Sequence, residues 1–200
     1  MKVIGITGGV GCGKTTVLEE IKKHCQCRVI LADQVGNEVK QPGTDCYKKL
    51  VAVLGEDVLG SDGTIDKNRM AEKIFADKTL LEQINAIIHP AVNGYIHQAI
   101  AKEREENTLE LLFIEAALLI ECGYETLVDE LWYIFALDQV RMQRLQENRQ
   151  YSLQKIQQIM NGQLTEEEFR THCRVTIDNS HEFEKTKEQI IAQLDRVLER

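Results

Sequence analysis

The segment Gly8–Thr15 constrains this chain more than any other part of its sequence. It reads G-G-V-G-C-G-K-T and matches the pattern G-x-x-x-x-G-K-[ST] in full. An apolar segment, residues 3–6, precedes it, and a helical pattern carrying Val17, Leu18 and Ile21 on one face follows it. Glycines let successive backbone amides point inward as an anion nest, and the positive end of the following helix points at the same place. The sequence therefore predicts a strand, a phosphate-binding loop and a helix, in that order.

This phosphate loop supplies most of the candidate nucleotide-binding residues. They are Gly9, Gly11, Cys12, Gly13, Lys14, Thr15 and Thr16. Lys14 offers a mobile cation for the β- and γ-phosphates of ATP, and the Thr15 hydroxyl is a candidate Mg²⁺ ligand. The alternative, a chance glycine turn, is disfavoured by the strand before it and the helix after it. A dinucleotide-binding fingerprint fails, because Lys14 stands where its third glycine belongs.

Short apolar segments alternate with longer helical patterns along the chain. The predicted strands cover residues 3–6, 28–31, 109–114, 131–137 and 175–177. This alternation predicts an α/β fold, with a parallel sheet flanked by helices. The active crevice of such a sheet lies at the carboxyl ends of its strands. Asp33, Glu115 and Asp138 follow three of the predicted strands and are therefore candidate site residues.

The region from residue 34 to residue 107 reads as mostly helical. Asp66 is placed to cap a helix that carries Met70, Ile74 and Phe75. Pro90 follows a strong apolar stripe, and we expect it to start a new helix.

Composition narrows the classes of partner. The chain has 200 residues and a net charge of −8, and an acidic chain is a poor partner for nucleic acid or an anionic membrane. No apolar stretch approaches the roughly 20 residues that span a bilayer, so we expect a cytoplasmic protein. The six cysteines show no Cys-x-x-Cys spacing, and we expect reduced thiols rather than a metal site.

Phosphate binding alone does not name the acceptor. A regulatory GTPase needs a guanine-reading Asn-Lys-x-Asp, which this chain lacks, and a small-molecule kinase fits the length best. Another nucleoside or nucleotide kinase and a nucleotide-gated module without transfer activity stay open as alternatives. Between Gln34 and Glu103 the only arginine is Arg69, which argues against a phosphorylated mononucleotide as acceptor.

Five motifs, in order, resemble those of the dephospho-coenzyme A kinase family. They are Thr7–Thr15, Ile30–Asp33, His89–Pro90, Glu115–Glu121 and Ile177–Asn179. The resemblance implies a P-loop kinase that transfers phosphate from ATP, with magnesium, to the ribose 3′-hydroxyl of dephospho-coenzyme A. It also implies one domain over residues 1–200, with an inserted helical substrate region at about 60–106 and a lid at about 139–172.

The resemblance also implies roles for individual residues. Asp33 matches the aspartate that acts as base or orienting group at the acceptor hydroxyl; its alternative role is to cap a helix starting near Gln34. Glu115 stands where the family has aspartate and is a candidate magnesium-side acid; its alternative is a solvated strand end. Asn179 is expected near the adenine, with a helix cap as the alternative. Leu31 replaces an aspartate of the family pattern.

Arginines of the predicted lid are candidates for neutralising charge on the transferred phosphoryl group. Arg144 matches the first arginine of the family pattern R-L-x-x-R, whereas the second, Arg149, is displaced by one position. Arg141 is expected to pair with Glu147 on a charged helix face. The sequence does not give the oligomeric state or the preference between ATP and GTP.

Overall fold

The computed structural model describes residues 1–77 and 79–199. The chain divides into two compact units. The sheet unit comprises Met1–Ile30 and Glu103–Arg200, and the helical unit comprises Leu31–Lys102. The helical unit begins at the end of the second strand of the sheet. A substrate region at about 60–106 stays a prediction.

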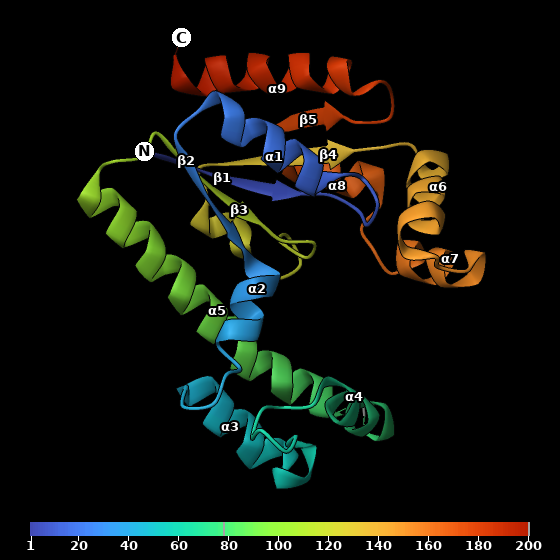
Figure 1. The fold of residues 1–200 in the computed structure, drawn as a ribbon. Helices are drawn as coiled ribbons and strands as arrows, with labels where there is room; N and C mark the ends of the chain where they lie inside the picture. The colour runs from blue at the N-terminus through green and yellow to red at the C-terminus, as the bar shows by residue number, and fades with distance from the viewer. Residues whose placement is uncertain (78, 200) are drawn as a thin grey trace. The chain divides into compact units, whose positions relative to one another are not determined.

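The sheet unit carries five strands and their covering helices (Figure 1). Its elements are β1 (Lys2–Thr7), α1 (Lys14–His24), β2 (Cys27–Leu31), β3 (Leu111–Glu115), η2 (Tyr124–Leu127), β4 (Glu130–Phe135), α6 (Asp138–Arg149), α7 (Leu153–Asn161), α8 (Glu166–His172), β5 (Val175–Asp178) and α9 (Phe183–Leu198). The strand order is β2-β3-β1-β4-β5. β1 pairs in parallel with β3 and β4, and β4 pairs in parallel with β5. The predicted α/β architecture is confirmed.

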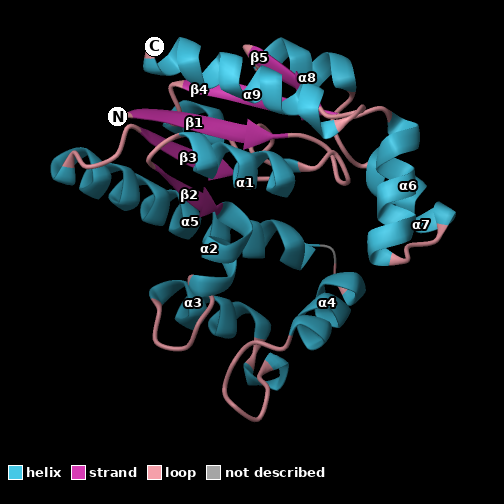
Figure 2. Cartoon of the chain, turned by 45° about the horizontal axis from the view of Figure 1, so that its top comes forward, coloured by secondary structure: helices cyan, strands magenta, loops and turns pink. Residues whose placement is uncertain are grey.

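The strands of the sheet are apolar because helices cover both of its faces. The side chains from Leu111 to Ile114 in β3 are all fully buried. Figure 2 shows α1 and α9 on one side of the strands, and these two helices pack against each other. On β4, Tyr133 stacks on Phe169 of α8 with ring centroids 4.7 Å apart. β1 is the central strand, so the phosphate loop that follows it lies in the middle of the sheet's edge.

The helical unit has its own small core. It contains α2 (Ala32–Glu38), α3 (Asp45–Leu54), η1 (Glu56–Val58), α4 (Lys67–Ala76) and most of α5 (Thr79–Glu106). Cys46, Leu50, Leu54, Val58 and Ile84 form its buried cluster. Asp66 caps α4 as predicted, since its carboxylate accepts hydrogen bonds from the backbone amides of Asn68 and Arg69.

The prediction that Pro90 starts a helix is wrong. α5 runs without interruption from Thr79 to Glu106, with Pro90 inside it. A proline within a helix removes one hydrogen bond and crowds the preceding turn. Ile84 before it and Val92 and Ile96 after it are all buried, so packing along both halves keeps the helix in one piece.

Among the described residues, no helix is both long enough and apolar enough to cross a bilayer. None of the six cysteines forms a disulfide bond, and the described residues contain no group of three or more His, Cys, Asp or Glu side chains arranged to hold a metal.

Candidate active site

The phosphate loop connects the end of β1 to the start of α1. Within it, the Cys12 amide donates to the Gly9 carbonyl at 3.2 Å, which closes a tight turn. Gly13 directly precedes α1 with a left-handed backbone, φ 91°. A Cβ at Gly13 would overlap the Asn179 amide nitrogen, so both the backbone angle and the space require glycine here.

Lys14 is held between two oxygen atoms. Its Nζ donates to the Gly8 carbonyl at 2.8 Å and lies 3.5 Å from Glu115 Oε1. The two side chains are only 12% and 16% exposed, so the ion pair is weakly screened. Glu115 reaches this place because β3 pairs with β1 and sets Glu115 opposite Ile6, just before the loop. The sequence prediction that Glu115 lies beside the phosphate loop is confirmed.

Thr15 and Thr16 begin α1 with exposed side chains. Among the described residues, the Thr15 hydroxyl has no hydrogen-bond partner in the protein, so its oxygen is available to a ligand. Cys12, by contrast, is buried, and burial raises the pKa of its thiol above the ordinary value of 9.0. Its side chain therefore stays neutral and adds no negative charge under a bound phosphate.

Arg144 of α6 contacts the same loop. One of its guanidinium nitrogens donates to the Cys12 carbonyl at 3.3 Å and the other to the Asn179 carbonyl at 2.9 Å. The guanidinium thus joins the loop after β1 to the segment after β5. A carbonyl carries only a partial charge, so Arg144 retains positive charge at the loop.

The expectation that Arg141 pairs with Glu147 is wrong. Arg141 Nε donates to the Val10 carbonyl at 3.0 Å, and its Nη2 donates to Gln163 Oε1 at 2.9 Å. That same Gln163 oxygen accepts the Val10 amide at 3.0 Å. Glu147 instead accepts a hydrogen bond from Gln143.

Arg141 and Gln163 together fix the tip of the phosphate loop, and Gly9 leaves room for the arginine, because a Cβ there would overlap the guanidinium. Sequence reasoning missed both residues. The available signal was the spacing of Arg141 and Arg144, which puts two arginines on one face of a helix.

The structure gives no helix irregularity that would bring Arg149 to the position of a second lid arginine. α6 is a regular α-helix from Asp138 to Arg149, and Arg149 is exposed at its end. Five residues of helix turn a side chain by about 140° relative to Arg144. Arg144 and Arg149 therefore point to different sides of α6.

Asn179 is a buried support of the loop. It is 3% exposed; its Nδ2 donates to the Cys12 carbonyl at 2.8 Å and its Oδ1 accepts the Thr186 hydroxyl at 3.1 Å. The helix-cap alternative for Asn179 is wrong, since α9 is preceded by Glu182 as its N-cap residue. Proximity to an adenine stays a prediction.

Asp33 belongs to the helical unit. It lies in the first turn of α2, exposed, one residue after Ala32 opens the helix. The N-cap position is occupied by Leu31, so the capping alternative for Asp33 is wrong. Its carboxylate is favoured by the positive end of the helix dipole and is accessible to a ligand.

Comparison with known proteins gives a consistent result. A family model described as dephospho-CoA kinase matches residues 2–185. A curated relative from Geobacter sulfurreducens, named dephospho-CoA kinase, is 34% identical over 196 residues, which cover 96% of this chain and 98% of the relative. A solved structure from Thermus thermophilus superposes with a TM-score of 0.80 at 25% identity, covering 98% of this chain and 97% of the other. The fold is also that of a dephospho-CoA kinase from Campylobacter jejuni, with a TM-score of 0.74, 19% identity and coverage of 98% and 97%.

Proposed function

This chain belongs to the dephospho-CoA kinase family, and we propose that it transfers the γ-phosphoryl group of ATP to the ribose 3′-hydroxyl of dephospho-CoA, giving CoA and ADP. The observation that carries this proposal is the phosphate loop, with Lys14 held at its base between Gly8 and Glu115. Such a loop can bind a triphosphate, and the identity of the acceptor is inferred from the family to which the chain belongs.

Three cations of the sheet unit have assigned roles in binding the triphosphate. Lys14 exchanges its contact with the Gly8 carbonyl for phosphate oxygens, which carry more negative charge. Arg144 neutralises charge that develops on the transferred group, and Arg141 holds the loop tip in shape through Val10. The loop amides and the N-terminus of α1 add further positive dipoles.

The loop also suits magnesium, which prefers oxygen ligands and keeps several waters. Thr15 offers a hydroxyl without a partner among the described residues, and Glu115 offers a carboxylate beside Lys14. We assign both to the metal, with Glu115 acting directly or through water. When bound, magnesium neutralises phosphate charge and orients the triphosphate.

Asp33 is assigned to the acceptor side. Phosphoryl transfer requires the acceptor oxygen in line with the leaving oxygen, and a carboxylate can orient the hydroxyl and accept its proton. The exposure of Asp33 at the start of α2 leaves its carboxylate free to receive a substrate hydroxyl.

The test is ADP release by the purified protein with ATP, magnesium and dephospho-CoA, with mass spectrometry of the product. We expect ADP to form in step with CoA. The Asp33→Asn variant should lower kcat by about 10²- to 10⁴-fold, because the proton acceptor is removed, while the Kd for ATP stays unchanged. Normal turnover by this variant would remove Asp33 from the chemistry. A wild-type protein that binds ATP without forming CoA would instead favour another acceptor or a non-catalytic module.

A further inference from the structure

A small cavity in the helical unit gathers positive charge. It has a volume of about 50 Å³ and lies between the end of α2 and the start of α4. Lys40 and Lys67 line it, together with the polar side chains of Asn37, Gln41 and Thr64. One water needs about 10–15 Å³, so the cavity has room for a group the size of a phosphate.

Among the described residues, the ammonium groups of Lys40 and Lys67 form no ion pair with a carboxylate. The two acids on the neighbouring loop are already engaged. Asp62 accepts hydrogen bonds from the amide and hydroxyl of Thr64, and Asp66 accepts the two amides that cap α4. The residues that line the cavity therefore bring two positive charges and no carboxylate.

This arrangement is unfavourable without an anion. Burial lowers the pKa of Lys40 below its ordinary value of 10.5, and the neighbouring charge of Lys67 lowers it further. Lys67 is also the first residue of α4, where the helix dipole favours a negative charge and not a positive one. An anion between the two ammonium groups would relieve all of these costs at once.

The position of the cavity on α2 indicates which anion it binds. Asp33, Asn37 and Lys40 are spaced i, i+4 and i+7, which places them along one face of the helix. Val39, which follows the last residue of α2, keeps helical backbone angles, so this spacing holds to the end. The charge of Asp33 is near enough to Lys40 to raise its pKa slightly against the larger effects.

We propose that Lys40 and Lys67 bind the diphosphate of dephospho-CoA while Asp33 holds its 3′-hydroxyl, an inference that rests on the proposed function. In this acceptor only the C3′–C4′–C5′–O5′ path separates the hydroxyl from the diphosphate. When a base of the protein contacts the hydroxyl, the diphosphate must therefore lie within about one side-chain length of that base. Arg69, the region's only arginine, is not available for this, since it donates to the Asp57 and Leu59 carbonyls.

The test measures binding, so that it does not depend on turnover. Calorimetric titration of dephospho-CoA is compared for the wild type, Lys40→Gln, Lys67→Gln and the control Lys49→Gln, an exposed lysine of α3 in the same unit. Each cavity variant should weaken binding by about tenfold, the size of a charge-assisted hydrogen bond, and the control should not. Thermal melting checks that all the variants stay folded.

Titration of adenosine tests whether the lysines contact the diphosphate, because adenosine keeps the base and the 3′-hydroxyl but lacks the diphosphate. Its affinity should be the same in the wild type and both cavity variants. Dephospho-CoA affinities equal to that of the Lys49→Gln control, or equal losses with adenosine, would overturn the inference. A wild type that binds dephospho-CoA but does not phosphorylate it would reject the proposed function alone.

Discussion

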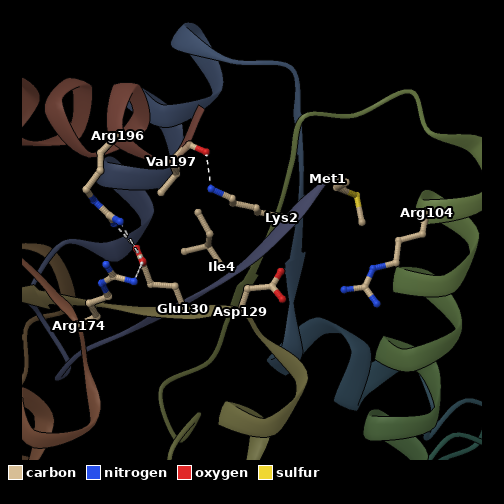
Figure 3. Close-up of a pocket in the computed structure, with 9 residues that line it drawn as sticks. All are labelled: Met1, Lys2, Ile4, Arg104, Asp129, Glu130, Arg174, Arg196 and Val197. Atoms are coloured by element: carbon tan, nitrogen blue, oxygen red, sulfur yellow. Dashed lines mark hydrogen bonds and ion pairs between the residues drawn. The ribbon is translucent and has the colours of Figure 1, made fainter. Parts of the chain in front are cut away.

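The two ends of the sheet carry charged side chains that are neutralised in different ways. At the carboxyl ends of the strands, Arg144 and Lys14 donate to backbone carbonyls of the phosphate loop. At the amino ends, Glu130 receives the guanidinium groups of Arg196 and Arg174 and the indole nitrogen of Trp132. Figure 3 shows both arginines converging on the Glu130 carboxylate.

The difference separates a binding end from a structural end. At the carboxyl ends Lys14 also pairs with Glu115 and Arg141 with Asp138, but among the described residues the Arg144 guanidinium has only carbonyl partners. A carbonyl offsets only part of a cation's charge, so the charge of Arg144 stays available to phosphates. At the amino ends, carboxylates and arginines offset one another. A cavity of about 600 Å³ lies there, lined in part by Glu130 and Arg196. Charge removal is therefore expected to cost activity at the carboxyl ends and to leave kcat unchanged at the amino ends.

The largest effect is expected for Lys14→Ala. In the proposed function its ammonium contacts the phosphates, and loss of such a preorganised charge should lower kcat by about 10³-fold. Stability should also fall, by about 1 to 2 kcal/mol, because the variant removes the weakly screened ion pair with Glu115. Steady-state kinetics and thermal melting measure the two quantities.

Lys2→Ala is the matched control at the amino end, where Lys2 Nζ also donates to a carbonyl, that of Val197. Its kcat should equal that of the wild type. If the two variants lost similar activity, the proposed division between the ends would fail.

Arg144→Gln should lower kcat by about 10²-fold, since one guanidinium that neutralises the phosphoryl group is lost while the loop keeps Arg141. Arg144→Lys should not restore it, because an ammonium cannot reach the Cys12 and Asn179 carbonyls as a fork. Full recovery by the lysine variant would show that charge alone is required.

Local features of the sequence predicted much of this molecule correctly. The phosphate loop, the strand that leads to Glu115 and the Asp66 cap all depend on residues that are neighbours in the chain, or on a hydrophobic period. Both are visible in a single sequence. Asp33 was correctly placed next to a strand end, although the helix begins one residue before it.

Contacts between distant segments could not be predicted. Arg141 was assigned to a surface pair, and Asn179 was weighed as a helix cap; instead they contact loop residues 131 and 167 positions away. No periodicity links such residues, since strand order brings them together. The prediction for Pro90 was wrong for a related reason. Burial of its neighbours outweighs the local rule that a proline interrupts a helix.

At the amino end, Glu130→Gln should lower the free energy of unfolding by about 1 to 2 kcal/mol without changing kcat, because the buried indole of Trp132 and the exposed guanidinium of Arg196 lose a charged acceptor. Burial works to raise the pKa of Glu130, but the hydrogen bonds from Arg196 and Trp132 outweigh it, and the pKa lies below the ordinary 4.5. The stabilisation is therefore present above pH 4.5 and is lost as the pH falls through the lower folded value.

Urea unfolding of both proteins between pH 7 and pH 4 measures this difference. The gap between wild type and variant should be constant at neutral pH and shrink towards the acid end. A gap that widened on acidification, or a parallel loss of kcat, would contradict a purely structural role for Glu130.

The smallest effect is expected for Arg149→Gln. Arg149 is exposed and lies about 140° around α6 from Arg144, so kcat should change by less than about twofold. Asn148→Arg is the more informative variant. Position 148 lies about 40° around the helix from Arg144, so the new arginine would stand on the same side of α6 as Arg144. A rise in kcat for Asn148→Arg, with none for Arg149→Gln, would show that a second arginine at the spacing R-L-x-x-R assists the role that we propose for Arg144. A large loss for Arg149→Gln would mean instead that α6 turns during the reaction to bring Arg149 to the phosphates.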